Sequence, residues 1–180
     1  MRLSTFTILR FTWLTTTTAL LAVGSSAAAT DCKPRNPDGY AASDELAAWI
    51  GKAVDDFYPF RDTWAAAYDA SFAPNLSATF NATKFDFNTL RAAYGSFLPK
   101  LQGQYAGTFG HGYYSVVAVP HASDRGGFVY ITGWAGGYID GDADRLYNVS
   151  HAAFGVVEQQ GDCTIKIAEW RESSNMAPSP

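Results

Sequence analysis

The chain has 180 residues and a formal net charge of −4, because 17 acidic residues outnumber 13 lysines and arginines. An acidic chain without a basic stripe is a poor candidate for binding nucleic acid or an anionic membrane. Hydrophobic residues make up 47% of the sequence and aromatic residues 15%, which suffices for one core and an aromatic-lined cavity in a single domain.

Residues 1–29 are predicted to be a signal peptide. Arg2 and Arg10 supply a positive start, residues 11–23 form an apolar run, and residues 27–29 are the small residues of a cleavage site. The alternative, a retained membrane anchor, requires ~20 apolar residues, and this run is shorter. We therefore expect the mature chain, which starts at residue 30, to be secreted.

Three N-glycosylation sequons, which begin at Asn75, Asn81 and Asn148, agree with a secreted chain. Each predicts a surface position that carries a glycan. The two cysteines, Cys32 and Cys163, are interpreted as a disulfide, because an isolated pair in an oxidising compartment is most simply bonded. The sequence near Cys163 offers no further ligands, so no metal site is predicted.

The first half of the chain is predicted to be mainly helical, after a lead-in loop over residues 30–42. Ser43 and Asp86 are good N-caps, and Pro59 and Pro99 are expected to end helices. Helices are expected over residues 43–57, 62–72 and 86–98, with a short strand or extended turn over 77–85.

The second half of the chain has the two-residue alternation of β-strands. Strands are expected over residues 109–119, 128–139, 146–159 and 163–171. Their short connections predict an antiparallel meander. Residues 173–180 are predicted to form a disordered tail. Helices followed by strands indicate the α+β class.

The order of these elements is similar to that of the NTF2-like, or SnoaL-like, family. The segment from Trp64 to Tyr68, followed by Phe72-Ala73-Pro74-Asn75, resembles the usual entry of that family into its first strand. The resemblance covers about residues 43–172. It implies an α+β cone, in which three N-terminal helices pack on a strongly curved antiparallel sheet around one pocket. Family members include dehydratases, isomerases, cyclases and proteins without catalytic activity.

The expected strand over 146–159 can be phased by its sequon. If Asn148 carries a glycan, it points to solvent, and side chains alternate along a strand. Tyr147, Val149 and His151 then point into the cone.

Glu169 is the expected partner of His151. It is in phase with the apolar Ile167 on the last strand, and the hairpin places it about opposite His151. A histidine beside a carboxylate in an apolar cavity is typical of an acid–base pair. The alternative is that a bulge turns Glu169 outward, where it pairs with Arg171 or Lys166.

His111 is expected to share this cavity. It is in phase with Tyr113, Ser115 and Val117 on its strand. It occupies about the position of one of the two catalytic histidines of scytalone dehydratase, an NTF2-like enzyme. The second would fall near Thr132, so the resemblance covers half of that motif.

Aromatic side chains are expected to line the cavity and contact a substrate. The alternative is that these rings fill the core. The candidates are Tyr68, Tyr113, Trp134, Tyr138 and Tyr147.

Two functions are compatible with such a cavity. The first is a cofactor-independent dehydratase, isomerase or cyclase of a small hydrophobic or aromatic ring compound, with His111, His151 and Glu169 as catalytic residues. The second is a non-catalytic secreted module of the same fold, which binds an apolar ligand in its cavity or acts as an interaction module through the surface of a homodimer. Two histidines and a glutamate in one cavity favour the enzyme, because a lipid carrier requires fewer polar groups.

Overall fold

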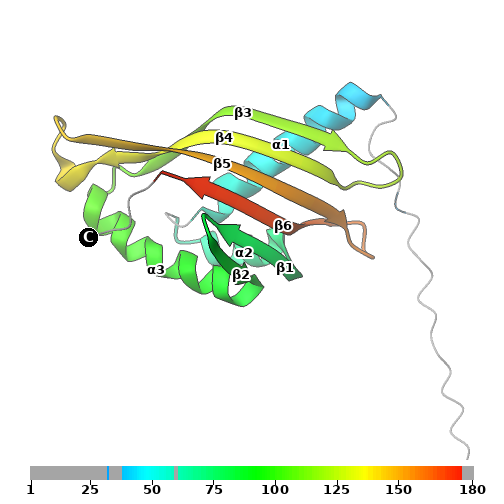
Figure 1. Cartoon of the computed structure of the whole chain (residues 1–180), viewed down its shortest axis with the longest axis horizontal. Coiled ribbons are helices and arrows are strands. Elements are labelled where there is room, and N and C mark those ends of the chain that lie inside the picture. Colours follow the sequence, from blue (N-terminus) through cyan, green and yellow to red (C-terminus); the bar gives the residue numbers. More distant parts are fainter. Residues whose placement is uncertain (1–31, 33–37, 59–60, 176–180) are drawn as a thin grey trace, which may run out of the picture.

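Three helices lie on one side of a curved six-stranded sheet (Figure 1). The computed structural model describes residues 32, 38–58 and 61–175. The predicted signal peptide, most of the lead-in loop, Pro59 and the last five tail residues lie outside these ranges. The helices are α1 (Gly39–Phe57), α2 (Trp64–Ser71) and α3 (Phe87–Tyr105), and the strands are β1 (Phe72–Phe80), β2 (Thr83–Asp86), β3 (Gly110–Pro120), β4 (Gly127–Tyr138), β5 (Leu146–Gln159) and β6 (Ile165–Ser174), with a 3-10 turn η1 (Ile139–Gly141) after β4.

Helix α1 begins one turn earlier than expected, at Gly39, so Ser43 lies inside the helix and is not its N-cap. The expected apolar stripe is present, and Leu46, Ile50 and Val54 are each at most 4% exposed. Burial of one such side chain contributes ~1.5–3 kcal/mol, more than the ~1 kcal/mol of a good cap. The stripe therefore positions α1 on the sheet.

Helix α3 has the expected cap and an unexpected end. The Thr89 amide donates to Asp86 Oδ1 at 2.8 Å, and the Asp86 amide donates to Thr89 Oγ1 at 2.9 Å, which is a capping box. The predicted end at Pro99 is wrong, since Pro99 lies inside the helix. The last turns remain helical because they bury Leu101 and Tyr105, which are 8% and 2% exposed.

The sheet has the order β2-β1-β6-β5-β4-β3. The predicted meander is confirmed, because β3, β4, β5 and β6 pair as antiparallel neighbours. Strand β1 pairs in parallel with β6, so the sheet is mixed and not purely antiparallel. The short strand or extended turn expected over 77–85 is a hairpin of β1 and β2, whose turn contains Asn81 at a left-handed φ of 51°. Strand β6 continues to Ser174, two residues into the predicted tail.

A disulfide joins Cys32 and Cys163, as predicted. It links the chain before α1 to the turn between β5 and β6 across 131 residues, which stabilises the fold by about 4–5 kcal/mol in the chain-entropy model. Asn75, Asn81 and Asn148 are exposed, as a sequon requires, and their glycosylation stays a prediction. Within the described ranges, no helix is long and apolar enough to cross a membrane.

Candidate functional site

The predicted phase of β5 is confirmed by burial. Val149 is 3% exposed, and the side chain of His151, two residues further along, is 8% exposed. Asn148 and Ser150 lie on the exposed face. His151 therefore projects from the inner face of the sheet, toward the helices.

The carboxylate partner of His151 is Glu172, and the predicted placement of Glu169 beside His151 is wrong. His151 Nδ1 lies 3.4 Å from Glu172 Oε1, and the Glu172 side chain is 7% exposed. Glu169 instead pairs with Arg171, which is the alternative arrangement that the sequence left open. The cause is a register shift at Val156, which stands opposite Glu169 on the outer face.

The shift inverts the alternation of β6 between Ile167 and Trp170. Ile165 and Ile167 are buried before it, and Trp170 and Glu172 are buried after it. A signal for this exists in the sequence, because the bulky apolar residues at 165, 167 and 170 cannot share one face of a regular strand. Placing Trp170 inside would have placed Glu172 inside as well.

Two further side chains hold the Glu172 carboxylate. The Trp170 indole Nε1–H donates to Glu172 Oε2 at 3.1 Å. Burial raises the pKa of Tyr94 well above its usual value, and the charge of Glu172 and a hydrogen bond to it raise this pKa further. Tyr94 is therefore a neutral hydroxyl at physiological pH. The carboxylate is oriented from several sides, as a buried charge requires.

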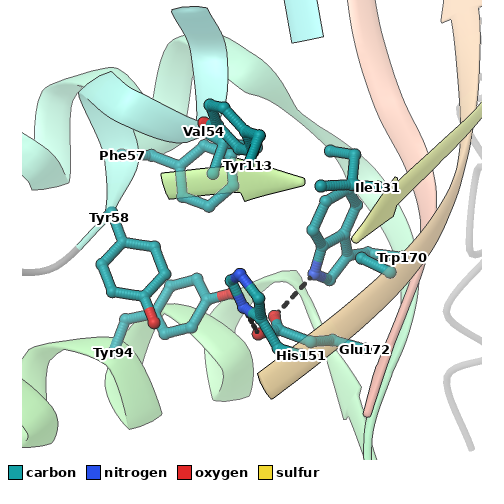
Figure 2. Close-up of a pocket in the computed structure, with 10 residues that line it drawn as sticks. Val54, Phe57, Tyr58, Tyr94, Tyr113, Ile131, His151, Trp170 and Glu172 are labelled. Atoms are coloured by element: carbon teal, nitrogen blue, oxygen red, sulfur yellow. Dashed lines mark hydrogen bonds and ion pairs between the residues drawn. The ribbon is translucent and has the colours of Figure 1, made fainter. Parts of the chain in front are cut away.

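A small pocket lies in front of His151 (Figure 2). Its unfilled volume is about 10 Å³, room for about one water molecule. The ring nitrogen of His151 that does not face Glu172 points toward Tyr58, Tyr113 and Ile131 (Figure 2). No group of the described residues hydrogen-bonds to this Nε2. The pocket is lined by Val54, Phe57, Tyr58, Tyr94, Tyr113, Ile131, His151, Ala153, Trp170 and Glu172.

Gly133 makes the space that the His151 ring occupies. It stands between Tyr113 and His151 in the register of β3, β4 and β5. A Cβ at this position would lie 2.6 Å from His151 Nε2 and 2.4 Å from the Gly112 carbonyl oxygen. Both distances are shorter than any normal contact, so only glycine fits here.

His111 lies beside the pocket, behind Tyr58. The two rings stack at 4.6 Å with an interplanar angle of 7°, and His111 Nε2 lies 3.2 Å from Asp55 Oδ1. Burial lowers the pKa of His111, and the negative charge of Asp55 partly offsets this. Tyr113 also donates to Asp55 Oδ1, at 2.8 Å, and burial raises the pKa of the Tyr113 hydroxyl.

The structure therefore brings both predicted histidines to one side of the sheet. Asp55, Tyr58, Tyr94 and Glu172 also belong to this cluster, although sequence reasoning did not select them. Asp55 and Tyr58 lie at the C-terminal end of α1. The sequence of this helix does not indicate which strand its polar side chains contact.

The predicted aromatic residues are divided among four environments. Tyr113 lines the pocket, as expected. Tyr147 is on the inner face of β5 but outside the pocket wall, and Tyr68 is fully buried in the core, where it donates to the Phe87 carbonyl at 2.9 Å. Trp134 and Tyr138 do not line the pocket, because the inward positions of β4 are odd-numbered.

Strand β3 changes face at a register shift between Tyr113 and Ser115. His111 and Tyr113 precede the shift and point inward. Ser115 and Val117 follow it and are exposed, so their predicted inward placement is wrong. The extra residue in this strand is Tyr114, which is 68% exposed.

Comparisons with known proteins identify the fold. No family model and no curated protein sequence matches the chain. A proposed SnoaL-like polyketide cyclase from Jannaschia sp. CCS1 is similar in structure, with a TM-score of 0.52, 13% identity, and coverage of 80% of this chain and 92% of the other. Nuclear transport factor 2 from Cryptosporidium parvum has a TM-score of 0.53 and 16% identity, covering 78% and 97%. A proposed SnoaL-like isomerase from Agrobacterium tumefaciens has a TM-score of 0.53 and 10% identity, covering 73% and 98%.

Proposed function

Because the chain has the NTF2-like fold, we propose that it is a secreted, cofactor-independent acid–base enzyme, a dehydratase, isomerase or cyclase. Its substrate is a small, uncharged hydrophobic or aromatic ring compound. The observation that carries this proposal is the buried His151–Glu172 pair, whose free imidazole nitrogen faces an aromatic pocket.

Glu172 determines how His151 can act. With Nδ1–H directed at the carboxylate, the imidazole is held in the tautomer whose Nε2 carries a lone pair. Trp170 fixes the second carboxylate oxygen, so the pair is preorganised. Nε2 then accepts a proton from the substrate as a general base and returns it as a general acid. Such proton transfer contributes typically 10²–10⁴-fold to a rate.

The lining residues favour an uncharged substrate. They include the Glu172 carboxylate and no lysine or arginine, so an anionic ligand would be repelled without compensation. The Tyr58 and Tyr113 hydroxyls, whose pKa values burial raises, stay protonated. A ring-sized ligand exceeds the present 10 Å³, so its entry requires a wall side chain to rotate, a common change on binding. Tyr58, directly after the last residue of α1, is the wall residue we expect to move.

The small volume of the pocket favours a second candidate, a non-catalytic interaction module of the same fold. In this case the aromatic residues are simply core, and His151 and Glu172 form a structural polar pair within it. A pocket that stays closed to every ring compound tested, in a folded protein whose stability His151→Asn leaves nearly unchanged, supports this alternative.

Exchange of carbon-bound protons with solvent tests the enzyme directly. The secreted protein is incubated in D₂O with a panel of small cyclic ketones and hydroxyketones, and deuterium uptake is followed by NMR. We expect exchange with the wild type and a ~10²–10⁴-fold loss in His151→Gln. His121→Gln is the matched control, because His121 lies on the β3–β4 turn and pairs with Asp124. Equal exchange in wild type and His151→Gln rules out His151 as the base.

A further inference from the structure

The pocket contains a buried carboxylate, and none of its described lining residues is a lysine or an arginine. The Glu172 side chain is 7% exposed, and its ion-pair partner among the described residues is His151. This histidine is neutral when its Nδ1–H donates to the carboxylate and its Nε2 keeps a lone pair. A buried charge without a full countercharge is unfavourable. A cationic ligand that enters the pocket is therefore attracted to it.

Aromatic rings surround this negative charge. The face of an aromatic ring attracts a cation that lies within about 6 Å of its centre, and the attraction is stronger where water is excluded. Several rings around one point form the usual site for an organic ammonium ion. The walls and the charge therefore favour the same class of ligand. The rings that line the pocket are those of Phe57, Tyr58, Tyr94, Tyr113 and Trp170 (Figure 2).

The pocket also offers an acceptor for an N–H donor. His151 Nε2 is buried, and no group of the described residues hydrogen-bonds to it. A primary ammonium ion can donate a hydrogen bond to this nitrogen, whereas a quaternary ammonium ion has no N–H. Hydrogen bonds from a charged donor are about twice as strong as those from a neutral one. His151 therefore favours a primary ammonium group over both a quaternary one and a neutral hydroxyl.

The tyrosine hydroxyls act as further acceptors. Burial raises the pKa values of Tyr58 and Tyr113, so both hydroxyls stay neutral and keep oxygen lone pairs. Tyr113 donates its proton to Asp55 Oδ1 at 2.8 Å, so toward a ligand its oxygen is an acceptor. Asp55 adds a second negative charge behind this ring, and Arg61, which acts on His111, is exposed to solvent. The site therefore fits a ligand that donates hydrogen bonds.

The size of the pocket fits the head group of such a ligand. The unfilled volume is about 10 Å³, room for about one water molecule, and an ammonium group is about as large as a water molecule. A substituent on the nitrogen requires the same rotation of a wall side chain as any ring-shaped ligand.

We propose that the pocket binds a small primary ammonium ion with an apolar substituent, a protonated cyclic or aromatic amine, in preference to a neutral molecule of the same shape. The ammonium group donates to His151 Nε2 beside the Glu172 carboxylate, and the aromatic rings enclose the substituent. The proposal concerns a ligand that occupies the pocket and does not depend on catalysis. Where His151 acts as a general base, the amine engages the lone pair of that base and inhibits the reaction.

Titration of the purified protein with matched ligands tests the proposal. Cyclohexylammonium and cyclohexanol have nearly the same shape, and binding of each is measured by NMR near neutral pH. The titrations are done in about 0.5 M NaCl, which screens the attraction of cations to exposed acidic side chains. We expect the amine to bind about 10-fold or more tightly than the alcohol. Cyclohexyltrimethylammonium, which has no N–H, should bind more weakly than cyclohexylammonium.

Two variants identify the charge that is responsible. Glu172→Gln removes the charge and keeps the shape of the side chain, so we expect it to lose the preference for the amine while it still binds cyclohexanol. Glu169→Gln is the matched control, because Glu169 pairs with Arg171 outside the pocket, and it should keep the preference. Circular dichroism confirms that each variant is folded.

The comparison of ligands in the wild type decides the proposal even where Glu172→Gln does not fold. Equal affinities for cyclohexylammonium and cyclohexanol overturn it, as does a lack of amine binding at about 10 mM. A quaternary ion that binds as tightly as the primary one, or a folded Glu172→Gln protein that keeps the preference, also overturns it. A wild type that binds the amine but exchanges no carbon-bound protons contradicts the proposed enzyme and supports this site.

Discussion

Glu172 and Glu169 lie three residues apart on β6. Replacing each with alanine compares the loss of a buried carboxylate in the site with the loss of a carboxylate on the outer face. Glu172→Ala removes the acceptor of Trp170 Nε1 at 3.1 Å and the partner of His151 Nδ1 at 3.4 Å. Each donor left buried without an acceptor costs about 1–3 kcal/mol, with the longer contact at the lower end. Breaking a buried pair typically costs about 3–5 kcal/mol, and we expect the free energy of unfolding to fall by this amount.

Glu169→Ala is the matched control. Glu169 pairs with Arg171, whose side chain is 66% exposed, and exposed pairs contribute ~0–1 kcal/mol. Equilibrium unfolding in urea measures both variants, and equal slopes against denaturant confirm that the same surface is exposed. A loss in Glu169→Ala as large as in Glu172→Ala, or a loss below about 1 kcal/mol in Glu172→Ala, would refute the assignment of Glu172 as the buried carboxylate.

Two further perturbations examine the same cluster. Gly133→Ala places a Cβ 2.4 Å from the Gly112 carbonyl oxygen and 2.6 Å from His151 Nε2, so we expect a loss of about 1–3 kcal/mol in urea unfolding together with loss of proton exchange. Gly103→Ala, where a Cβ meets nothing within 4 Å, should instead stabilise α3 by about 0.5–1 kcal/mol, and an equal loss in both would contradict the close approach at Gly133. Burial lowers the pKa of His111 below its usual 6.5. As the pH falls below 6.5, His111 is therefore protonated in the unfolded chain before it is protonated in the folded chain. The neutral His111 supports full stability above pH 6.5, and part of this stability is lost below that pH. Unfolding between pH 7.5 and 5 should therefore show a smaller acid loss in His111→Gln than in the wild type, and identical pH profiles would exclude His111 as the titrating group.

The sequence was sufficient to predict the order of the three helices and the four long strands, and much of their packing. Short turns between alternating segments leave few topologies other than a meander, so the pairing of β3 to β6 is local information. The helical stripe that contains Leu46 and Ile50 and the phase of β5 also follow from periodicity. The parallel pairing of β1 with β6 does not, because it joins segments about 90 residues apart whose alternation is the same for either orientation.

The site was predicted only in part, because a one-residue register shift inverts the alternation of inward and outward side chains between the first and last residues of a strand. On β3 the shift lies after Tyr113, so phasing from His111 was correct up to that residue and wrong beyond it. On β6 it lies before Trp170, so phasing from Ile167 selected Glu169 in place of Glu172. Each shift adds one residue, a change that no average over a strand's composition reveals.

The same two shifts determine which side chains of β3 and β6 lie on the inner face of the sheet and which lie on its outer face. On β6 the shift brings Glu172 under the helices and leaves Glu169 and Arg171 on the outer face of the sheet. On β3 it keeps His111 and Tyr113 at the pocket side and turns Val117 outward. A strand of regular alternation would have placed Val117 inside and Glu172 outside. The inward position of Glu172 and the outward position of Val117 thus each depend on a one-residue shift in their own strand.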